Sequence, residues 1–199
     1  MKKAIGILVC ILTLLVCVGA MADVTINEMN FPDANFRQFI QEEGFDANGN
    51  GILSNSEIAG VTIIWCPQKG IKTLKGIEHF TALNELYCYS NELTSLDVSR
   101  NTALTVLWCH SNKLTSLDVS KNTALTYLAC GDIQIKSLDV SKNTALTRLV
   151  CNNNQLKSLD VSKNTALIAL YCDNTQLTNL DVSKNMSSTS ENVSRNWEH

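Results

Sequence analysis

The sequence contains few residues that break regular structure: 2 prolines and 9 glycines among 199 residues exclude a collagen-like or linker-like chain. Basic residues do not outnumber acidic ones, and the net charge of -3 gives no positive surface for nucleic acid or anionic lipid. The 3 histidines fall in no motif that would pair them with a nucleophile or with metal ligands. These absences argue against an enzyme and against a nucleic-acid-binding protein.

The first 22 residues have the pattern of a secretory signal peptide. Lys2 and Lys3 precede an apolar run from residue 4 to residue 18, and Ala20 and Ala22 occupy the positions that signal peptidase reads. Lipidation at Cys17 is the alternative for this segment. Nothing after residue 22 is apolar enough to form a membrane span. The expected location is therefore outside the cell, as a secreted or surface protein.

A 21-residue repeat begins at residue 83. Two successive units read LTSLDVSRNTALTVLWCHSNK (93–113) and LTSLDVSKNTALTYLACGDIQ (114–134). Their spacing, L-x-x-L-x-C-x-x-N-x-L-x-x-L, is the leucine-rich-repeat pattern with cysteine where leucine is usual. With a looser first copy around Ile64, the chain has six strand-bearing copies. This predicts a leucine-rich-repeat solenoid with one parallel β-strand per coil and turns or short 3-10 segments on the back.

One cysteine occupies the same inward position of each copy: Cys66, Cys88, Cys109, Cys130, Cys151 and Cys172. The regular spacing favours buried free thiols that pack as small apolar groups. Disulfides between adjacent coils are the alternative, since equivalent side chains of stacked coils run side by side. The chain has no C-x-x-C or Cys/His spacing that would indicate zinc.

Two polar columns repeat with the same period. After the strand come Asn91, Asn112 and Asn154, whose amides can satisfy backbone groups inside the coil. The second column is acidic and consists of Asp97, Asp118, Asp139, Asp160 and Asp181. We expect its repulsion to be offset by the basic residues three positions later and by local hydrogen bonds of the Asx type.

The segment before the repeats contains a match to the EF-hand calcium loop, DANGNGILSNSE at residues 46–57. Six residues of this loop are the predicted calcium ligands: Asp46, Asn48, Asn50, Ile52 (through its carbonyl), Ser54 and Glu57. Only two of these residues carry charge, and no second loop accompanies them, so we expect weak, structural Ca²⁺ binding in the range of ~10⁻⁴–10⁻³ M. A metal-free turn that only shapes a helical cap is the alternative.

The outward strand positions vary between copies while the core positions stay constant. They hold all four tyrosines and two of the three tryptophans. The residues we predict to form a ligand-binding face are Trp65, Tyr87, Tyr89, Trp108, His110, Tyr127, Arg148 and Tyr171. Exposed aromatic side chains on one sheet face suit protein hot spots and sugar stacking, although aromatic residues also favour strands for their own packing.

The TALTxLxCxxNxLTxLDVSKN repeats, the EF-hand-like cap and the signal-like segment together resemble bacterial surface proteins of the internalin family, in particular its cysteine-ladder, internalin J-like branch. The resemblance covers about residues 24–185. It implies a secreted or surface-displayed leucine-rich-repeat protein that binds host or extracellular ligands and works as an adhesin.

The sequence therefore divides into a signal peptide (1–22), a helical cap (23–60), a solenoid (61–185) and a polar, unstructured tail (186–199). We expect a monomer that recognises an extracellular protein or glycan. The alternatives are a structural spacer or truncated relative of a larger surface protein, and a secreted inhibitor or scavenger that uses the same face.

Overall fold

The computed structural model describes residues 23–185 and 193–194, so the expected signal peptide lies outside the described residues. The cap comprises β1 (Val24–Thr25), α1 (Ala34–Glu42), β2 (Ile52–Leu53) and α2 (Asn55–Gly60). The repeats carry β3 (Ile63–Trp65), β4 (Glu85–Tyr87), β5 (Val106–Trp108), β6 (Tyr127–Ala129), β7 (Arg148–Val150) and β8 (Ala169–Tyr171), and a last strand, β9 (Val193–Ser194), follows them.

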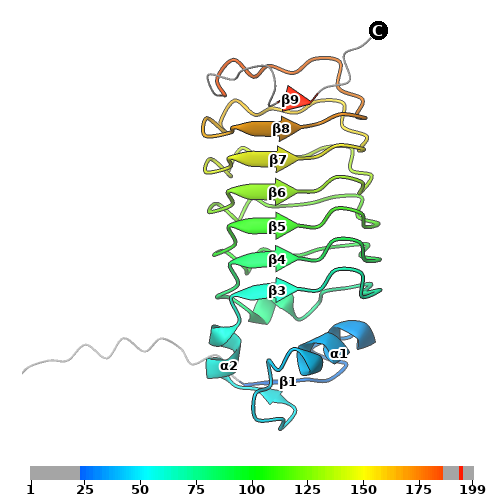
Figure 1. Ribbon diagram of the computed structural model, residues 1–199, viewed down its shortest axis with the longest axis vertical. Helices are drawn as coiled ribbons and strands as arrows, with labels where there is room; N and C mark the ends of the chain where they lie inside the picture. Colours follow the sequence, from blue (N-terminus) through cyan, green and yellow to red (C-terminus); the bar gives the residue numbers. More distant parts are fainter. Residues whose placement is uncertain (1–22, 186–192, 195–199) are drawn as a thin grey trace, which may run out of the picture.

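The strands β3 to β9 form one parallel sheet in sequence order, stacked like rungs in Figure 1. Equivalent residues pair: Leu86 lies opposite Leu107, and Leu107 lies opposite Leu128. Each coil returns behind its strand through turns, with one 3-10 segment, η1 (Ile77–His79), among the described residues. The predicted leucine-rich-repeat solenoid is confirmed, and the six copies read from the sequence carry β3 to β8.

The cysteine column lies inside the coils, and all six thiols are free and buried. Cys66, Cys88 and Cys109 have no exposed surface. Burial raises the pKa of the Cys66 and Cys109 thiols to about 12, so they stay protonated at neutral pH. The thiols therefore act as small apolar side chains, as the regular spacing predicted, and not as disulfides.

The predicted asparagine column ties the turn after each strand to the neighbouring coil. The Asn112 amide nitrogen donates to the carbonyls of Cys88 (3.0 Å) and Cys109 (2.9 Å), and its oxygen accepts from the Leu93 N–H (3.0 Å). Asn91 and Asn154 make the corresponding bonds. Where Thr175 replaces asparagine, its hydroxyl donates to the Cys172 carbonyl alone, at 2.8 Å.

A second asparagine column was not recognised in the sequence. It consists of the fully or almost fully buried Asn101, Asn122, Asn143, Asn164 and Asn185. The Asn122 amide nitrogen, for example, donates to the Val98 and Asn101 carbonyls, both at 2.9 Å, and so joins two coils at the back of the solenoid. The signal in the sequence was the Asn that follows Ser-Arg or Ser-Lys in the copies of β4 to β8, at the same distance after the strand.

The aspartate column is stabilised by hydrogen bonds. Each carboxylate accepts from the serine two residues later, as Asp118 does from the Ser120 N–H at 2.8 Å. The backbone and side-chain hydrogen bonds from Ser120 lower the pKa of Asp118, with a smaller contribution from Lys121. No salt bridge joins this column to the basic residues in the part of the chain that the structure describes. The expected Asx bonds are therefore present, and the basic neighbours act only at longer range.

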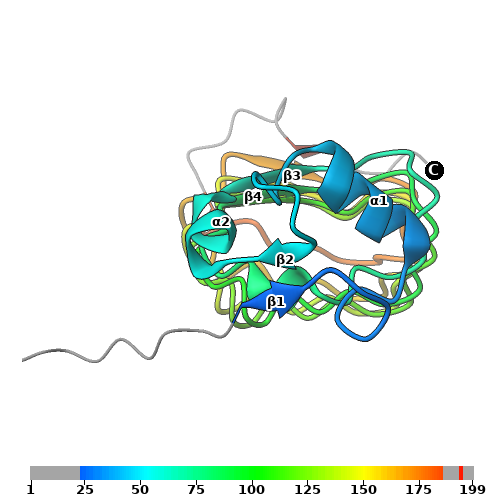
Figure 2. The same cartoon turned by 90° about the horizontal axis from the view of Figure 1, so that it is seen from below.

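The cap closes the first coil with aromatic side chains, and Figure 2 shows its helices and β1–β2 lying across the end of the solenoid. The Phe31 and Phe45 rings contact Phe80 of the first coil, with centroids 6.4 and 5.8 Å away. Asp33 caps α1 through the Phe36 N–H and also accepts from the Lys72 N–H at 2.8 Å. One side chain thus starts the helix and fixes it to the repeats.

The C-terminal end differs from the expectation of an unstructured tail. β9 lies inside residues 186–199 and pairs in parallel with β8, Leu170 opposite Val193 and Tyr171 opposite Ser194. The unpaired edge of β8 supplies the reason, because backbone groups at an exposed edge pair with any available extended segment. Within the described residues, no helix is both long and apolar enough to cross a membrane.

The Asn112→Ala variant tests the asparagine column. It leaves the Cys88 and Cys109 carbonyls and the Leu93 N–H without this partner, and we expect the free energy of unfolding to fall by about 3 kcal/mol. Urea unfolding measures the change, with Asn179→Ala at an exposed position as the control. Equal small effects of the two substitutions would contradict a structural role for this column.

Candidate ligand-binding face

Six of the eight predicted face residues form one continuous group of rings, which we call the aromatic cluster: Trp65, Tyr87, Tyr89, Trp108, His110 and Tyr127. The ring centroids of Trp65 and Tyr87 lie 4.5 Å apart, and those of Tyr87 and Trp108 lie 5.0 Å apart. The cluster forms because in-register strands β3, β4 and β5 place equivalent outward side chains side by side.

The rings support one another and still present surface to solvent. Tyr89 and His110 stack at 4.7 Å with an interplanar angle of 10°, and Trp108 contacts Tyr127 at 5.3 Å. Trp65 is 51% exposed, although its ring touches Tyr87 and Tyr89. The cluster is therefore preorganised, and a ligand would meet side chains that are already held in place.

The other two predicted face residues lie at the margin of the cluster or apart from it. The Arg148 guanidinium lies over the Tyr127 ring, 5.9 Å from its centroid, and extends the cluster by a cation–π contact. Tyr171 on β8 is 42% exposed and has no ring contact among the described residues. The small side chains of Ala129 and Gly131 interrupt the aromatic columns at β6, so most rings of the cluster lie on or directly after β3 to β5, and Tyr127 is its one member on β6.

Glu85 is not aromatic and was not among the predicted face residues, but it contacts the aromatic cluster. Its carboxylate accepts a hydrogen bond from the Tyr87 hydroxyl at 2.7 Å. Burial, together with this hydrogen bond and the charge of Glu85, raises the pKa of Tyr87 to about 12. The hydrogen bond helps to fix the Tyr87 ring, which contacts Trp65 and Trp108. The signal in the sequence was the Glu85–Tyr87 spacing of two, which puts both side chains on one face of a strand.

His110 is neutral in this setting. Its Nδ1 lies 3.2 Å from the Ser111 hydroxyl, and its ring is covered on one side by Tyr89. Burial lowers the pKa of His110, and Asp132 opposes the shift only in part. The histidine therefore contributes to the face as a polar aromatic ring and not as a cation at neutral pH.

The predicted calcium loop folds with its polar side chains directed to its own backbone. Asp46 accepts from the N–H groups of Asn50 (3.1 Å) and Gly51 (2.7 Å), and Asn50 accepts from the Ile52 N–H at 2.8 Å. Gly51 has a φ of 78°, which supplies the sharp turn in the middle of the loop.

Glu57 closes the loop from its other end. One carboxylate oxygen accepts from the Ala47 N–H (2.9 Å) and the Asn48 amide (3.0 Å), and the other accepts from the Ser54 N–H (2.8 Å) and hydroxyl (2.7 Å). These bonds, led by the Ser54 N–H, lower the pKa of Glu57, so it is anionic at neutral pH. The bond from the Ser54 N–H to Glu57, together with the bond from the Glu57 N–H to the Ser54 hydroxyl, forms a capping box for α2.

The donor set of this loop fits a hard cation. It offers oxygen atoms alone, which calcium prefers, and Glu57 draws the two ends of the loop together. It holds two carboxylates, and the described residues include no group of three or more His, Cys, Asp or Glu side chains placed to bind a metal ion. Amide, hydroxyl and backbone oxygens would have to complete the coordination.

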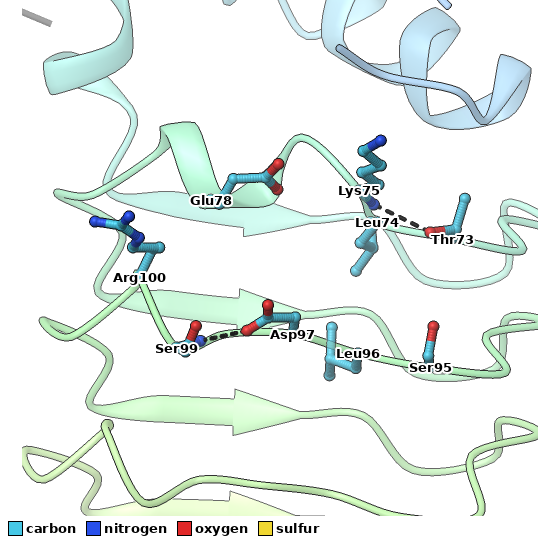
Figure 3. A pocket seen from close by; sticks show the side chains of 9 residues that line it. All are labelled: Thr73, Leu74, Lys75, Glu78, Ser95, Leu96, Asp97, Ser99 and Arg100. Carbon is cyan, nitrogen blue, oxygen red and sulfur yellow. Dashed lines mark hydrogen bonds between the residues drawn. The ribbon is translucent and has the colours of Figure 1, made fainter. Parts of the chain in front are cut away.

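The solenoid also has a groove on its back surface, shown in Figure 3. It has a volume of about 450 Å³ and runs between two coils, with Leu96, Asp97 and Arg100 on one side and Lys75 and Glu78 on the other. A similar groove of about 370 Å³ recurs four coils later around Asp160 and Asp181. Because equivalent positions of the coils line both grooves, the groove follows from the coil geometry and does not mark a specific site.

Comparison with known proteins shows which proteins this chain resembles. No protein-family model matches the chain. Over 71 residues the chain is 41% identical to Internalin J of Listeria monocytogenes serotype 4b (strain F2365), a match that spans 36% of this chain and 8% of Internalin J.

Two solved structures extend the comparison. The functional domain of InlJ from Listeria monocytogenes, which includes a cysteine ladder, is 32% identical with a TM-score of 0.60, covering 88% of this chain and 48% of that one. The internalin InlF from the same species is 24% identical with a TM-score of 0.72, covering 80% of this chain and 48% of that one, and it shows the fold alone. The chain spans about half the length of these structures.

The fold and its buried thiol column thus define a leucine-rich-repeat protein with a cysteine ladder. Within that class the chain is internalin J-like, since both its sequence and its structure match internalin J.

The neutral state of His110 predicts a pH dependence of stability. Because burial holds its pKa below 6.5 in the folded chain, the unfolded chain takes up the proton first as the pH falls through about 6.5. We expect the melting temperature to drop more in the wild type than in His110→Gln between pH 7.5 and pH 5. Parallel curves for the two proteins, or an NMR-measured pKa of His110 above 6.5, would contradict this assignment.

Proposed function

We propose that this protein is a secreted or surface-displayed, non-catalytic binding protein that recognises an extracellular protein or glycan through the aromatic cluster. The observation that carries the proposal is the cluster itself, with six rings in contact across neighbouring strands of one sheet face. Large aromatic side chains dominate binding hot spots, and sugars stack on exposed rings.

Two further features support a recognition role. The variable residues of the repeats gather on the strand face, while the constant residues build the core and the turns. The likeness to internalin J supports the same class of protein. The internalin-like fold and the signal-like segment at residues 1–22 together support a location outside the cell.

Substitution of the cluster tests the proposal. The triple variant Trp65→Ala/Tyr87→Ala/Trp108→Ala is compared with wild type on immobilised extracellular-matrix proteins and on a glycan panel. We expect it to bind at least about tenfold more weakly than wild type, because it removes three of the six rings of the cluster, among them the half-exposed Trp65. Trp65→Ala alone is the milder variant, since this ring is half exposed and contributes less to folding.

The matched control changes the opposite surface, with alanine at the exposed serines Ser95, Ser116 and Ser137. This control should bind as wild type does. Equal binding by the cluster variant and wild type, or no binding by a folded wild-type protein, would instead favour a structural spacer.

We further propose that the loop from Asp46 to Glu57 binds calcium and stabilises the cap. The residues that would hold the ion are Asp46, Asn48, Asn50, Ile52, Ser54 and Glu57. A bound cation would neutralise Glu57, whose present partners are all uncharged donors. The loop connects α1 to α2, so its rigidity affects how the cap sits on the first coil.

The variant Glu57→Gln tests the calcium site with little change in shape. At about 10 mM calcium and a Kd of ~10⁻⁴–10⁻³ M, binding would add about 1.4–2.7 kcal/mol to the stability of the wild type. We expect calcium to raise the melting temperature of the wild type, relative to chelator, by more than that of Glu57→Gln. The exposed-carboxylate variant Asp118→Asn serves as the control. Identical calcium responses of all three proteins, with no heat of binding by calorimetry, would rule out the site.

A further inference from the structure

The two ends of the sheet differ in whether a further strand pairs with the last strand of the repeats. At the C-terminal end β9 covers β8, whereas at the N-terminal end β3 is the outermost strand of the sheet. The cap packs its phenylalanines onto the interior of the first coil, but β1 and β2 pair only with each other. The outer edge of β3 therefore gains no strand from the cap.

The register shows which backbone groups of β3 face outward. On β4, the N–H of Glu85 donates to Thr62 (3.1 Å) and the carbonyl of Tyr87 accepts from Cys66 (2.9 Å), so both groups point toward β3. Ile63 and Trp65 are the equivalent residues one coil earlier. Their N–H and carbonyl groups must point away from β4, and no hydrogen bond from them to another described residue is present.

The surroundings of this edge are open and partly apolar. A depression of about 530 Å³ lies beside the start of β3, between residues 60–63 and the loop residues Gly44, Phe45, Ala47 and Glu57. The side chains of Ile63 and Trp65 are each 51% exposed. An extended chain laid along β3 would find both backbone partners and apolar surface.

The charge around the depression has one sign. Its lining includes no basic side chain, and its one carboxylate, Glu57, belongs to the proposed calcium loop and adds no net charge when the ion is bound. Next to the lining residues Gly44 and Phe45, the exposed Glu42 and Glu43 lie outside that loop and keep the border acidic. In the described part of the chain, no salt bridge neutralises any of these carboxylates. This setting complements a segment that carries lysine or arginine next to apolar residues.

We propose that the outer edge of β3 is a docking site for an extended peptide of a partner protein, which adds a strand to the sheet and carries basic side chains toward the acidic border. In an antiparallel arrangement, Ile63 and Trp65 would each exchange two backbone hydrogen bonds with the peptide. This site differs from the aromatic cluster in its chemistry, because it would bind a peptide through backbone hydrogen bonds at the sheet edge. It shares only Trp65 with the cluster.

The test uses the purified protein and a phage-displayed library of random decapeptides. The expected result is a pool of proline-free, lysine- or arginine-containing peptides that binds wild type and binds Ile63→Pro at least tenfold more weakly. Proline at this position removes the outward N–H, and sheets tolerate it on edge strands where that N–H has no ladder partner. Trp108→Ala, which weakens the aromatic cluster on β5, should leave peptide binding unchanged, so failure of the proposed function and failure of this site are distinguishable.

A second measurement does not depend on how Ile63→Pro folds. An enriched peptide is synthesised with N-methyl groups on alternate residues in both possible phases. One phase should abolish binding and the other should retain it, because only one set of N–H groups can face β3. Failure to enrich peptides, equal loss in both phases, or loss of binding in Trp108→Ala would overturn the proposal. So would a concentration-dependent dimer of the wild type that Ile63→Pro abolishes, since a second copy would then be the occupant.

Discussion

The structure depends on the in-register stacking of one coil upon the next. No coil can bury its apolar side chains alone, because a single strand with a turn behind it has no second layer to cover them. Stacking supplies that layer, and the parallel pairing of Leu86, Leu107 and Leu128 sets the register. A shift of one residue would turn the core side chains to solvent, so the register is strongly determined.

The same stacking explains the buried polar groups and thiols. Each turn leaves carbonyl groups inside the coil, and the side-chain amides of Asn112 near the strand and Asn122 at the back donate to them. Asn112 also accepts from the Leu93 N–H, whereas the buried side-chain oxygen of Asn122 has no hydrogen-bond partner among the described residues. The cysteines fill the remaining inward position with a side chain small enough to repeat in every coil. The hydrogen bonds of the asparagine columns and the packing of the apolar side chains therefore repeat with the same period. This is why the repeat sequence varies so little away from the strand face.

That face is where the repeats are free to differ, and its chemistry follows from neighbouring strands. Trp65, Tyr87 and Trp108 become a cluster only because the register places them side by side. The periodicity stops at the two ends of the sheet, and the two ends are covered differently. β9 pairs with β8 at one end, while at the other end the cap seals the core but leaves the β3 backbone open to a partner.

The repeat period, the inward thiols and the order of the strands could be predicted from the sequence, because a 21-residue pattern of leucine, cysteine and asparagine has one packing solution. The outward position of the aromatic residues followed from the same alternation. Only the tertiary structure decided that Glu85 bonds Tyr87, that Arg148 lies over Tyr127, and that Tyr171 stands apart, since these depend on rotamers and on the small residues between strands. It also decided the pairing of β9 and the open edge of β3, because edges are set by what lies next to a strand in space and not by the residues of the strand itself.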